Sequence, residues 1–515
     1  MIASIRLGRT AALSLHFLCG CALGGCASSY LSRAPSSPAE PWTIPAEPPR
    51  SARAPRAPAI QIQPGHVYSL AELIDIAELT NPDTRIGWER ARRAALAVGS
   101  ARAEYFPTIS ALAIVGYQHL FFPAPGSSAS SPGLNSSEGP PSVSFPIPQR
   151  PDRSGYIGVD TFQILPFLSI KWPVLDLGRG DGVKAAENLS VAANAMFTAA
   201  HQKMMFEIAR AYFRLGAAQA QVAVNRDALS RTRSIAKAAD ARFAQGVATV
   251  VELSEAKREV AQAEYNLTQA EAGEVTRYAA LLSAMGVDPG VRPVIAITPS
   301  LELPGRLDEK VDHYVESAFA KRPDLYAARA RLPSTAAGVS RSEAAYWPRI
   351  NLVGTGGAAL LGAKIDGLDV KTVTIPNLSI AAIAEWMIFD GGLRDIQKEV
   401  ARSQHNEAEQ ELIKLEQQVV QEVTTNYNEL NANLSRYNAA SVLLVTARVA
   451  DDAVTKSYTN GLATLTDAMN AVKARSFALA AKEQAFADAL IAAASLAFSS
   501  GDLISAAAVP STVGR

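Results

Sequence analysis

The residues best placed to do chemistry in this chain are two aspartates that follow similar stretches of sequence. Residues 386–394 read WMIFDGGLR and residues 172–179 read WPVLDLGR, so Asp390 and Asp176 each lie between an apolar run and a glycine. An aspartate in such a turn could be the centre of an active site, but catalysis needs partner groups around it.

The sequence does not supply those partner groups. It contains no His-x-x-x-His pair and no glycine-rich phosphate loop, and its histidines are scattered along the chain. The six histidines are His16, His66, His119, His201, His313 and His405. We therefore expect no enzymatic reaction, no metal site and no cofactor. The two aspartates then have to be explained by the elements that they join.

Composition limits the class of protein. The chain has 515 residues, of which 48% are hydrophobic and 19% charged, enough for a large fold of one or more units. Its formal net charge is zero, whereas a nucleic-acid-binding protein needs a basic surface to neutralise phosphates. We therefore expect no nucleic-acid partner.

The N-terminus has the features of an export signal. Arg6 and Arg9 precede an apolar run over residues 10–23, and Leu-Gly-Gly-Cys at residues 23–26 follows. This pattern resembles a bacterial lipoprotein signal, and a plain secretory signal is the alternative.

A lipoprotein signal would be removed as residues 1–25, leaving Cys26 as the acylated first residue. The resemblance also implies the outer membrane, because Ala27 stands where an aspartate would retain the protein at the inner membrane. Residues 26–65 are rich in Pro, Ala, Ser and Arg, which predicts an extended tether between the lipid and the fold. Residues 506–515 are expected to form a short tail.

An internal repeat is the most informative feature of the chain. The motif YFP at residues 105–107 recurs as YWP at residues 346–348, a spacing of 348 − 107 = 241. Trp172 recurs as Trp386, where the spacing is only 386 − 172 = 214. The first repeat therefore carries 241 − 214 = 27 extra residues between these two motifs.

The insertion falls in a stretch rich in Pro, Gly and Ser, without apolar periodicity, which predicts a long loop over residues 119–156. We accordingly predict a first repeat over residues 66–300 and a second over residues 301–505.

Both repeats have the same predicted order of elements. A short amphipathic helix precedes a helix that begins at a Pro-Asp pair, Pro82-Asp83 or Pro323-Asp324. Two strands with alternating side chains follow and end at a tryptophan. A long helix, a glycine and a returning helix complete each repeat.

The alternating strands have two interpretations. A soluble sheet packed on its own core shows one apolar face. A transmembrane β-strand shows the same pattern, with lipid on one face and water on the other, and needs roughly 9 to 11 residues. Four strands are too few to close a barrel, which needs about eight, so the second interpretation requires an oligomer.

The long helices are unusual in length. Residues 393–456 contain neither proline nor glycine, and these 456 − 393 + 1 = 64 residues would span about 96 Å. Their apolar residues recur every three or four positions, as in a coiled coil. Gly246 and Gly461 end the two long helices, which predicts two helical hairpins. A purely structural coiled coil is the alternative.

Several motifs together resemble the TolC-like outer-membrane efflux proteins, in particular the lipid-anchored NodT/OprM-type group. They are RPDL at residues 322–325, FDGGLR at residues 389–394, the F/Y-x-x-G hairpin ends, the duplication and the lipoprotein signal. The resemblance covers about residues 65–505. It implies a mainly α fold with transmembrane β, in which duplicated helical hairpins form an α-barrel. Four strands per chain would contribute to the 12-stranded outer-membrane β-barrel of a homotrimer.

The resemblance also implies a function. The protein would be the exit duct of a tripartite efflux pump, in contact with outer-membrane lipid, a periplasmic adaptor and an inner-membrane RND-type pump. It leaves the transported substrates open. The alternative is a periplasmic adaptor-type coiled-coil lipoprotein that bridges the two membranes without forming a pore.

The family's gate lies at the periplasmic tip of the hairpins. The family pattern of Tyr-x-x-Gly followed by Asp corresponds here to Tyr458, Gly461 and Asp467. Asp467 is therefore the candidate for a three-fold ring of carboxylates, which would raise one another's pKa and attract cations. Asp451 and Asp452 are candidates for a second latch. A solvated helix face is the alternative for each of these acids.

Two further sets of residues follow from the resemblance. Small residues at the tip turns would let an adaptor hairpin approach closely, and glycines with a capping aspartate would form the joint between barrel and tunnel. The expected adaptor-binding residues are Gly246, Val247, Thr249, Gly461, Leu462 and Thr464. The expected joint residues are Trp172, Asp176, Trp386, Asp390, Gly391 and Gly392.

Overall fold

The computed structural model describes residues 66–123, 156–288, 293–295, 303–305, 307–365 and 368–503. All of them belong to the unit Ile62–Arg515. The predicted signal, the lipid-bearing Cys26, the tether over residues 26–65 and the tail over residues 506–515 lie outside the described residues, so these stay predictions.

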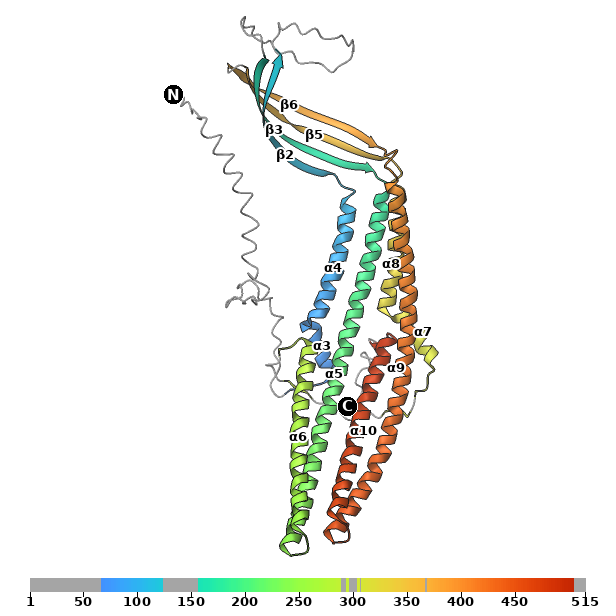
Figure 1. Cartoon of the computed structure of the whole chain (residues 1–515). Coiled ribbons are helices and arrows are strands. Elements are labelled where there is room, and N and C mark those ends of the chain that lie inside the picture. Colours follow the sequence, from blue (N-terminus) through green and yellow to red (C-terminus); the bar gives the residue numbers. More distant parts are fainter. Residues whose placement is uncertain are drawn as a thin grey trace, which may run out of the picture. The chain divides into compact units, whose positions relative to one another are not determined.

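The described elements follow the predicted order in both repeats (Figure 1). The first repeat consists of α3 (Leu70–Thr80), α4 (Pro82–Ala103), β2 (Thr108–Pro123), β3 (Tyr156–Leu175), α5 (Gly178–Ala244) and α6 (Val250–Met285). The second consists of α7 (Val311–Lys321), α8 (Pro323–Ala344), β5 (Arg349–Ile365), β6 (Leu368–Glu385), α9 (Leu393–Thr459) and α10 (Leu465–Ser499). Each element thus has a counterpart in the other repeat.

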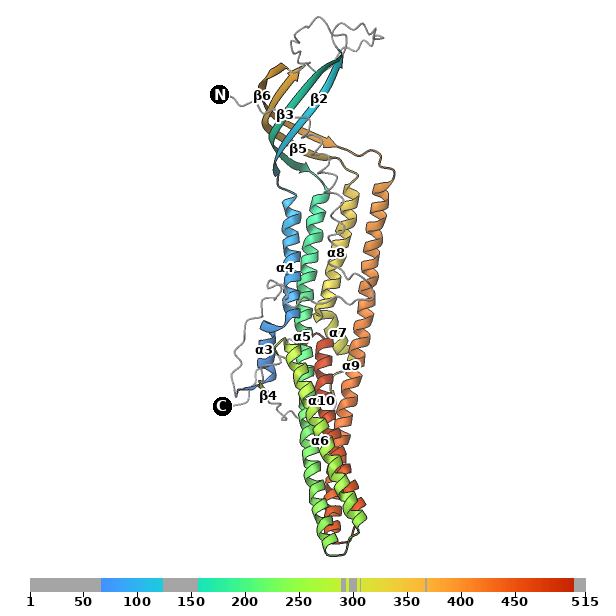
Figure 2. The same ribbon diagram turned by 60° about the vertical axis from the view of Figure 1, so that its left-hand side comes forward.

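The four long strands form one antiparallel sheet in the order β2-β3-β5-β6 (Figure 2). Residues 119–123 pair with residues 156–160, so the strands extend into both ends of the loop predicted over residues 119–156. The predicted loop was therefore too long, because the alternation of apolar and polar residues ends before the hydrogen-bonded pairing of the two strands does. Residues 124–155 lie outside the described part of the chain.

A second, two-stranded sheet was not predicted. β1 (Val67–Tyr68) pairs in parallel with β4 (Val294–Ile295), which joins the start of the first repeat to the segment between the repeats. Strands of two residues carry no periodicity, so the sequence gives no signal for them.

The long helices α5 and α9 have 67 residues each, which corresponds to about 100 Å. They pack against their returning helices α6 and α10, so the two predicted hairpins are confirmed (Figure 1). Among the described residues, no helix combines the length and the apolar character that a membrane crossing requires.

Each repeat closes on itself through a left-handed glycine at the end of its returning helix. Gly286 follows α6 with φ +72°, and its Cα faces the end of α3, where an added Cβ would lie 2.9 Å from the Thr80 carbonyl oxygen. Gly501 follows α10 with φ +78°, and an added Cβ would lie 3.0 Å from Lys321 at the end of α7. Only glycine combines this backbone conformation with so close an approach.

The core forms separate clusters along the helices. One lies among α3, α5 and α6 and includes Ile208 and Leu281. A second involves α7, α9 and α10, where Val419, Val423 and Leu434 of α9, which recur at the three- and four-residue steps of a coiled coil, are fully buried or nearly so. A third, near the hairpin turns, draws residues from α5, α6, α9 and α10, so the two repeats share this part of the core.

Candidate functional site at the hairpin tips and the joints

The two hairpin turns have the same construction. Gly246 and Gly461 have φ of +74° and +77°, and each ends a 67-residue helix. The hydroxyls of Thr249 and Thr464 then cap α6 and α10 by accepting hydrogen bonds from the amides three residues later, at 3.2 Å in both turns. Left-handed glycines let the chain reverse, and the threonines satisfy amides that the new helix leaves open.

The turns present apolar side chains outwards. Val247 is 64% exposed and Leu462 is 82% exposed, although both are large and apolar. The turns also lie close together, since Arg242 in α5 donates a hydrogen bond of 3.1 Å to the carbonyl of Tyr458 in α9. The expected adaptor-binding residues therefore form neighbouring tips, and their role in binding stays a prediction.

Tyr458 is not at the surface of the tip. Its ring is fully buried, the Arg242 guanidinium lies 5.1 Å from the ring centre, and its hydroxyl donates a 3.0 Å hydrogen bond to Glu252 in α6. Burial, with this bond to a carboxylate, raises the pKa of Tyr458 to about 12. Tyr458 thus links the second hairpin to the first.

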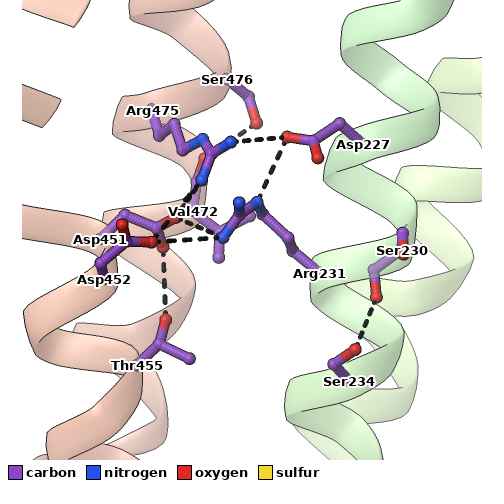
Figure 3. A network of polar contacts seen from close by, with 10 residues as sticks. All are labelled: Asp227, Ser230, Arg231, Ser234, Asp451, Asp452, Thr455, Val472, Arg475 and Ser476. Carbon is purple, nitrogen blue, oxygen red and sulfur yellow. Dashed lines mark hydrogen bonds and ion pairs between the residues drawn. The ribbon is translucent and has the colours of Figure 1, made fainter. Parts of the chain in front are cut away.

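A network of charges connects the two hairpins farther from the turns (Figure 3). Asp451 in α9 is fully buried and accepts hydrogen bonds from Arg231 in α5 at 3.0 Å and Arg475 in α10 at 3.2 Å. Both guanidinium groups also contact Asp227, at 3.2 and 3.4 Å. A buried carboxylate is costly without partners, so this arrangement ties three helices together at one point.

Asp452 differs from its neighbour. Its side chain is 62% exposed and lies 3.7 and 3.8 Å from Arg231 and Arg475 (Figure 3). The structure therefore places the buried Asp451 between the hairpins and leaves Asp452 mainly in solvent. Whether either acid acts as a latch stays a prediction.

Asp467 occupies the third position of α10. Its carboxylate accepts hydrogen bonds from the hydroxyl of Thr464 at 2.6 Å and the amide of Thr464 at 3.1 Å, which completes a capping box. These bonds lower the pKa of Asp467, the hydroxyl contributing most. Asp467 is exposed at the tip, and its place in a three-fold acidic ring stays a prediction.

Sequence reasoning missed the arginines that hold Asp451. A signal was nevertheless present, because Leu430, Tyr437, Leu444, Asp451 and Tyr458 follow one another at seven-residue steps. An acid at a seam position of a coiled coil must be buried and therefore needs cationic partners. The identity of those partners depends on how α5 and α10 pack beside α9.

The joints between sheet and helices repeat the same contacts. The indole nitrogens of Trp172 and Trp386 donate hydrogen bonds of 3.0 Å to the carbonyls of Tyr105 and Tyr346. The guanidinium groups of Arg179 and Arg394 lie 4.7 and 5.0 Å from the centres of the same tyrosine rings. The two motifs of the repeat, distant in sequence, thus meet at one point in each half.

Asp176 and Asp390 lie directly before the two long helices. Asp176 accepts a 3.0 Å hydrogen bond from the amide of Gly178, and Asp390 accepts 3.1 Å bonds from the amides of Gly392 and Arg394. Both carboxylates thus satisfy amides at a helix start. Within the described residues, no group of three or more His, Cys, Asp or Glu side chains is placed to hold a metal ion.

The two joints differ in backbone conformation. Gly391 and Gly392 have φ of +69° and +88°, whereas Leu177 in the first joint has a helical φ of −67°. The second joint therefore needs glycine and the first does not.

Comparison with known proteins gives a family match in both repeats. The family described as "Outer membrane efflux protein" matches residues 73–287 and 314–502. Among curated proteins, the chain is 30% identical to "Outer membrane protein OprJ" of Pseudomonas aeruginosa over 215 residues, 40% of this chain and 42% of that protein. It is 26% identical to "Protein CyaE" of Bordetella pertussis over 288 residues, 55% of this chain and 53% of that protein. The match thus spans about half the length of these relatives.

A solved structure with the same fold is the Campylobacter jejuni CmeC outer membrane channel. It superposes with a TM-score of 0.67 over 84% of this chain and 85% of that one, at 16% sequence identity.

Proposed function

Because the chain belongs to the outer membrane efflux protein family, we propose that it is the exit duct of a tripartite efflux pump. In this role it carries small toxic molecules, such as drugs, from the periplasm to the exterior. The observation that supports the proposal best is the duplicated unit of strands, joint and long hairpin, since the family match covers this unit in both halves. The adaptor-type alternative has a single hairpin, whereas this chain has two.

The duct is a homotrimer in this proposal. The sheet of one chain is open, with β2 and β6 as its edges. Unpaired edges expose backbone hydrogen-bonding groups, and pairing β6 of one chain with β2 of the next removes all edges when three chains close a ring of 12 strands. The helices continue this ring as a tunnel.

The remaining parts of the proposal concern attachment and partners. Cys26 carries the lipid that anchors the chain in the outer membrane, and the tether over residues 26–65 links it to the fold. The exposed Val247 and Leu462 at the hairpin turns are the contact for a periplasmic adaptor, which connects the duct to an inner-membrane RND-type pump.

The gate lies at the hairpin tips. Contacts of Asp451 and Tyr458 with the first hairpin hold the second hairpin in place, and opening requires these contacts to separate. Asp467 lines the constriction and selects cations.

Reconstitution tests the proposal. The purified, acylated protein should form cation-selective channels in planar bilayers and run as a trimer, and deletion of its gene should sensitise cells to dyes, antibiotics or detergents. A protein that mild washing releases from membranes while porins stay embedded, and that forms no channels, would contradict it.

A further inference from the structure

The two faces of the four-stranded sheet differ in exposure. On β6, Val373 and Ile375 are 46% and 47% exposed, whereas Leu378 and Ile380 on the opposite face are 75% or more exposed. On β2, Ile114 is 42% exposed and its neighbour Val115 on the opposite face 65%. The face that carries Ile114 and Ile375 is therefore the inner face of the curved sheet.

This inner face carries polar side chains near the helices and, on β2 and β3, again beyond the middle of the strands. Towards the helices, the hydroxyls of Ser110 and Ser169 lie 2.9 Å apart, and those of Thr355 and Ser379 lie 2.6 Å apart. Farther from the helices, β2 and β3 carry the polar side chains Gln118, Thr161 and Gln163, and the apolar pair Leu120 and Val159 follows them. A water-filled lumen favours such residues.

An apolar band interrupts the polar surface between these two zones. The ladder aligns Leu112 with Phe167, and Ile114 with Leu165, on the inner face of β2 and β3. It aligns Ala359 with Ile375, and Leu361 with Val373, on the inner face of β5 and β6. We call these eight residues the inner band. Its members on β2 and β3 are staggered relative to those on β5 and β6, so that Leu361 is paired with Gln163 of β3, and Gly357, the partner of Phe167, is paired with Asn377 of β6.

A glycine fixes the centre of the inner band. Gly357 is paired with Phe167, and an added Cβ at Gly357 would lie 2.3 Å from the carbonyl oxygen of Pro166 and 2.7 Å from the Cβ of Phe167. No other residue fits there without moving the strands. Strand β5 therefore approaches Phe167 closely and adds no bulk of its own beside the ring.

The inner band is not explained by packing across the barrel. In a ring of 12 strands the interior is wider than in the eight-stranded barrels that side chains can fill. The band would then face water in the lumen, where large apolar side chains are unfavourable unless an apolar molecule covers them.

We propose that the inner band is a cargo-binding site on the lumen wall, which takes amphiphilic organic molecules with an apolar body and a polar or charged end. This inference rests on the proposed function, since it requires the inner face to line a conducting barrel. The apolar body of the molecule contacts residues such as Phe167 and Leu165. Its polar end reaches the nearby hydroxyl groups of Ser169 and Ser110. Hydrated inorganic ions pass without binding.

Block of the channel by tetraalkylammonium ions tests the site. The full-length protein is reconstituted in planar bilayers, and the ions are added on the side of the strand ends, so that they reach the barrel before the hairpin tips. Block should strengthen from tetraethylammonium to tetrahexylammonium. In the double variant Leu165→Gln, Phe167→Gln, the dissociation constant for tetrahexylammonium should rise about tenfold, with little change for tetraethylammonium or for potassium conductance.

Matched variants separate binding from folding. Thr161→Ala, on the same face of β3 but away from the inner band and from Ser169, and Phe167→Leu, which keeps an apolar side chain, should both retain the dependence on chain length. If the glutamine variant does not assemble, Ile114→Thr with Ile375→Thr removes apolar surface from two other strands and should weaken tetrahexylammonium block in the same way. If an assembled variant of the inner band is blocked by tetrahexylammonium as strongly as the unmodified protein, the proposed binding site is wrong, and the proposed duct is unaffected. If the unmodified protein forms no channel, the proposed duct itself is wrong.

Discussion

At the scale of single residues, the tip depends on buried charges whose partners lie on other helices. The sequence identifies Asp451 as a candidate latch but does not identify its partners Arg231 and Arg475. The seven-residue spacing specifies that Asp451 is buried. It does not specify which cations face it, because this follows from the packing of three helices.

Replacing Asp451 should loosen the tip. In Asp451→Ala, the two guanidinium groups lose their buried carboxylate and keep Asp227 and the more distant Asp452, and removing one partner of a buried charge network costs about 3–5 kcal/mol. Denaturant unfolding should show this loss, and channel conductance should rise because the hairpins separate more easily. Asp452→Ala is the control, and a similar loss of stability in both variants would contradict the special role of Asp451.

Tyr458 should make the tip sensitive to alkaline pH. Its pKa is about 12 in the folded protein and about 10 in an unfolded chain, so the folded state holds the proton more tightly. The stabilisation is complete below pH 10 and is lost as pH rises from about 10 to 12. Stability measured against pH should fall in this window, and Tyr458→Phe should reduce the fall. An equal fall in the variant would assign the effect to other groups.

Asp467 has two possible roles that one pair of variants can separate. Asp467→Ala should increase conductance and cation leak in planar bilayers if the carboxylate lines the constriction. It also removes a capping contact, which costs helices about 1 kcal/mol. Thr464→Ala removes the same cap and keeps the carboxylate. Equal conductance changes in both variants would indicate capping alone.

At the scale of elements, the sequence specified the repeat, the helix starts at Pro82 and Pro323, and the two hairpins. These features depend on local signals: spacing, proline and glycine. The pairing of β1 with β4 and the length of β2 and β3 were not predictable in the same way. They depend on strands meeting across long separations, where two-residue segments or polar strand ends leave no periodic pattern.

The joints should respond unequally to the same substitution. Gly391→Ala and Gly392→Ala force alanine into a left-handed conformation and should each destabilise the protein by about 1–2 kcal/mol. Leu177→Ala, at the position equivalent to Gly391, should have little effect, since Leu177 has a helical backbone and is half-exposed. Chemical denaturation measures the free energy of unfolding of the three variants. An unchanged value for Gly392→Ala would show that this joint tolerates another backbone geometry.

At the scale of the whole molecule, the open sheet determines what one chain can do alone. Its edges β2 and β6 carry large apolar residues on the outer face, such as Val115 and Ile380, which are unfavourable in water. Mass measurement in lipid nanodiscs should therefore give three chains per particle. A monomeric particle that still conducts would contradict the shared barrel.

The closing glycines have a consequence for biogenesis. Gly286 packs on the end of α3, and Thr80 and Asn81 donate hydrogen bonds to the carbonyls of Met285 and Ala284, all within the first repeat. In the proposed export the chain crosses the inner membrane from its N-terminus, so these contacts can form before the second repeat has crossed. The first repeat can then begin to fold while the second repeat is still being translocated. This shortens the time for which the apolar surface of the first repeat is exposed.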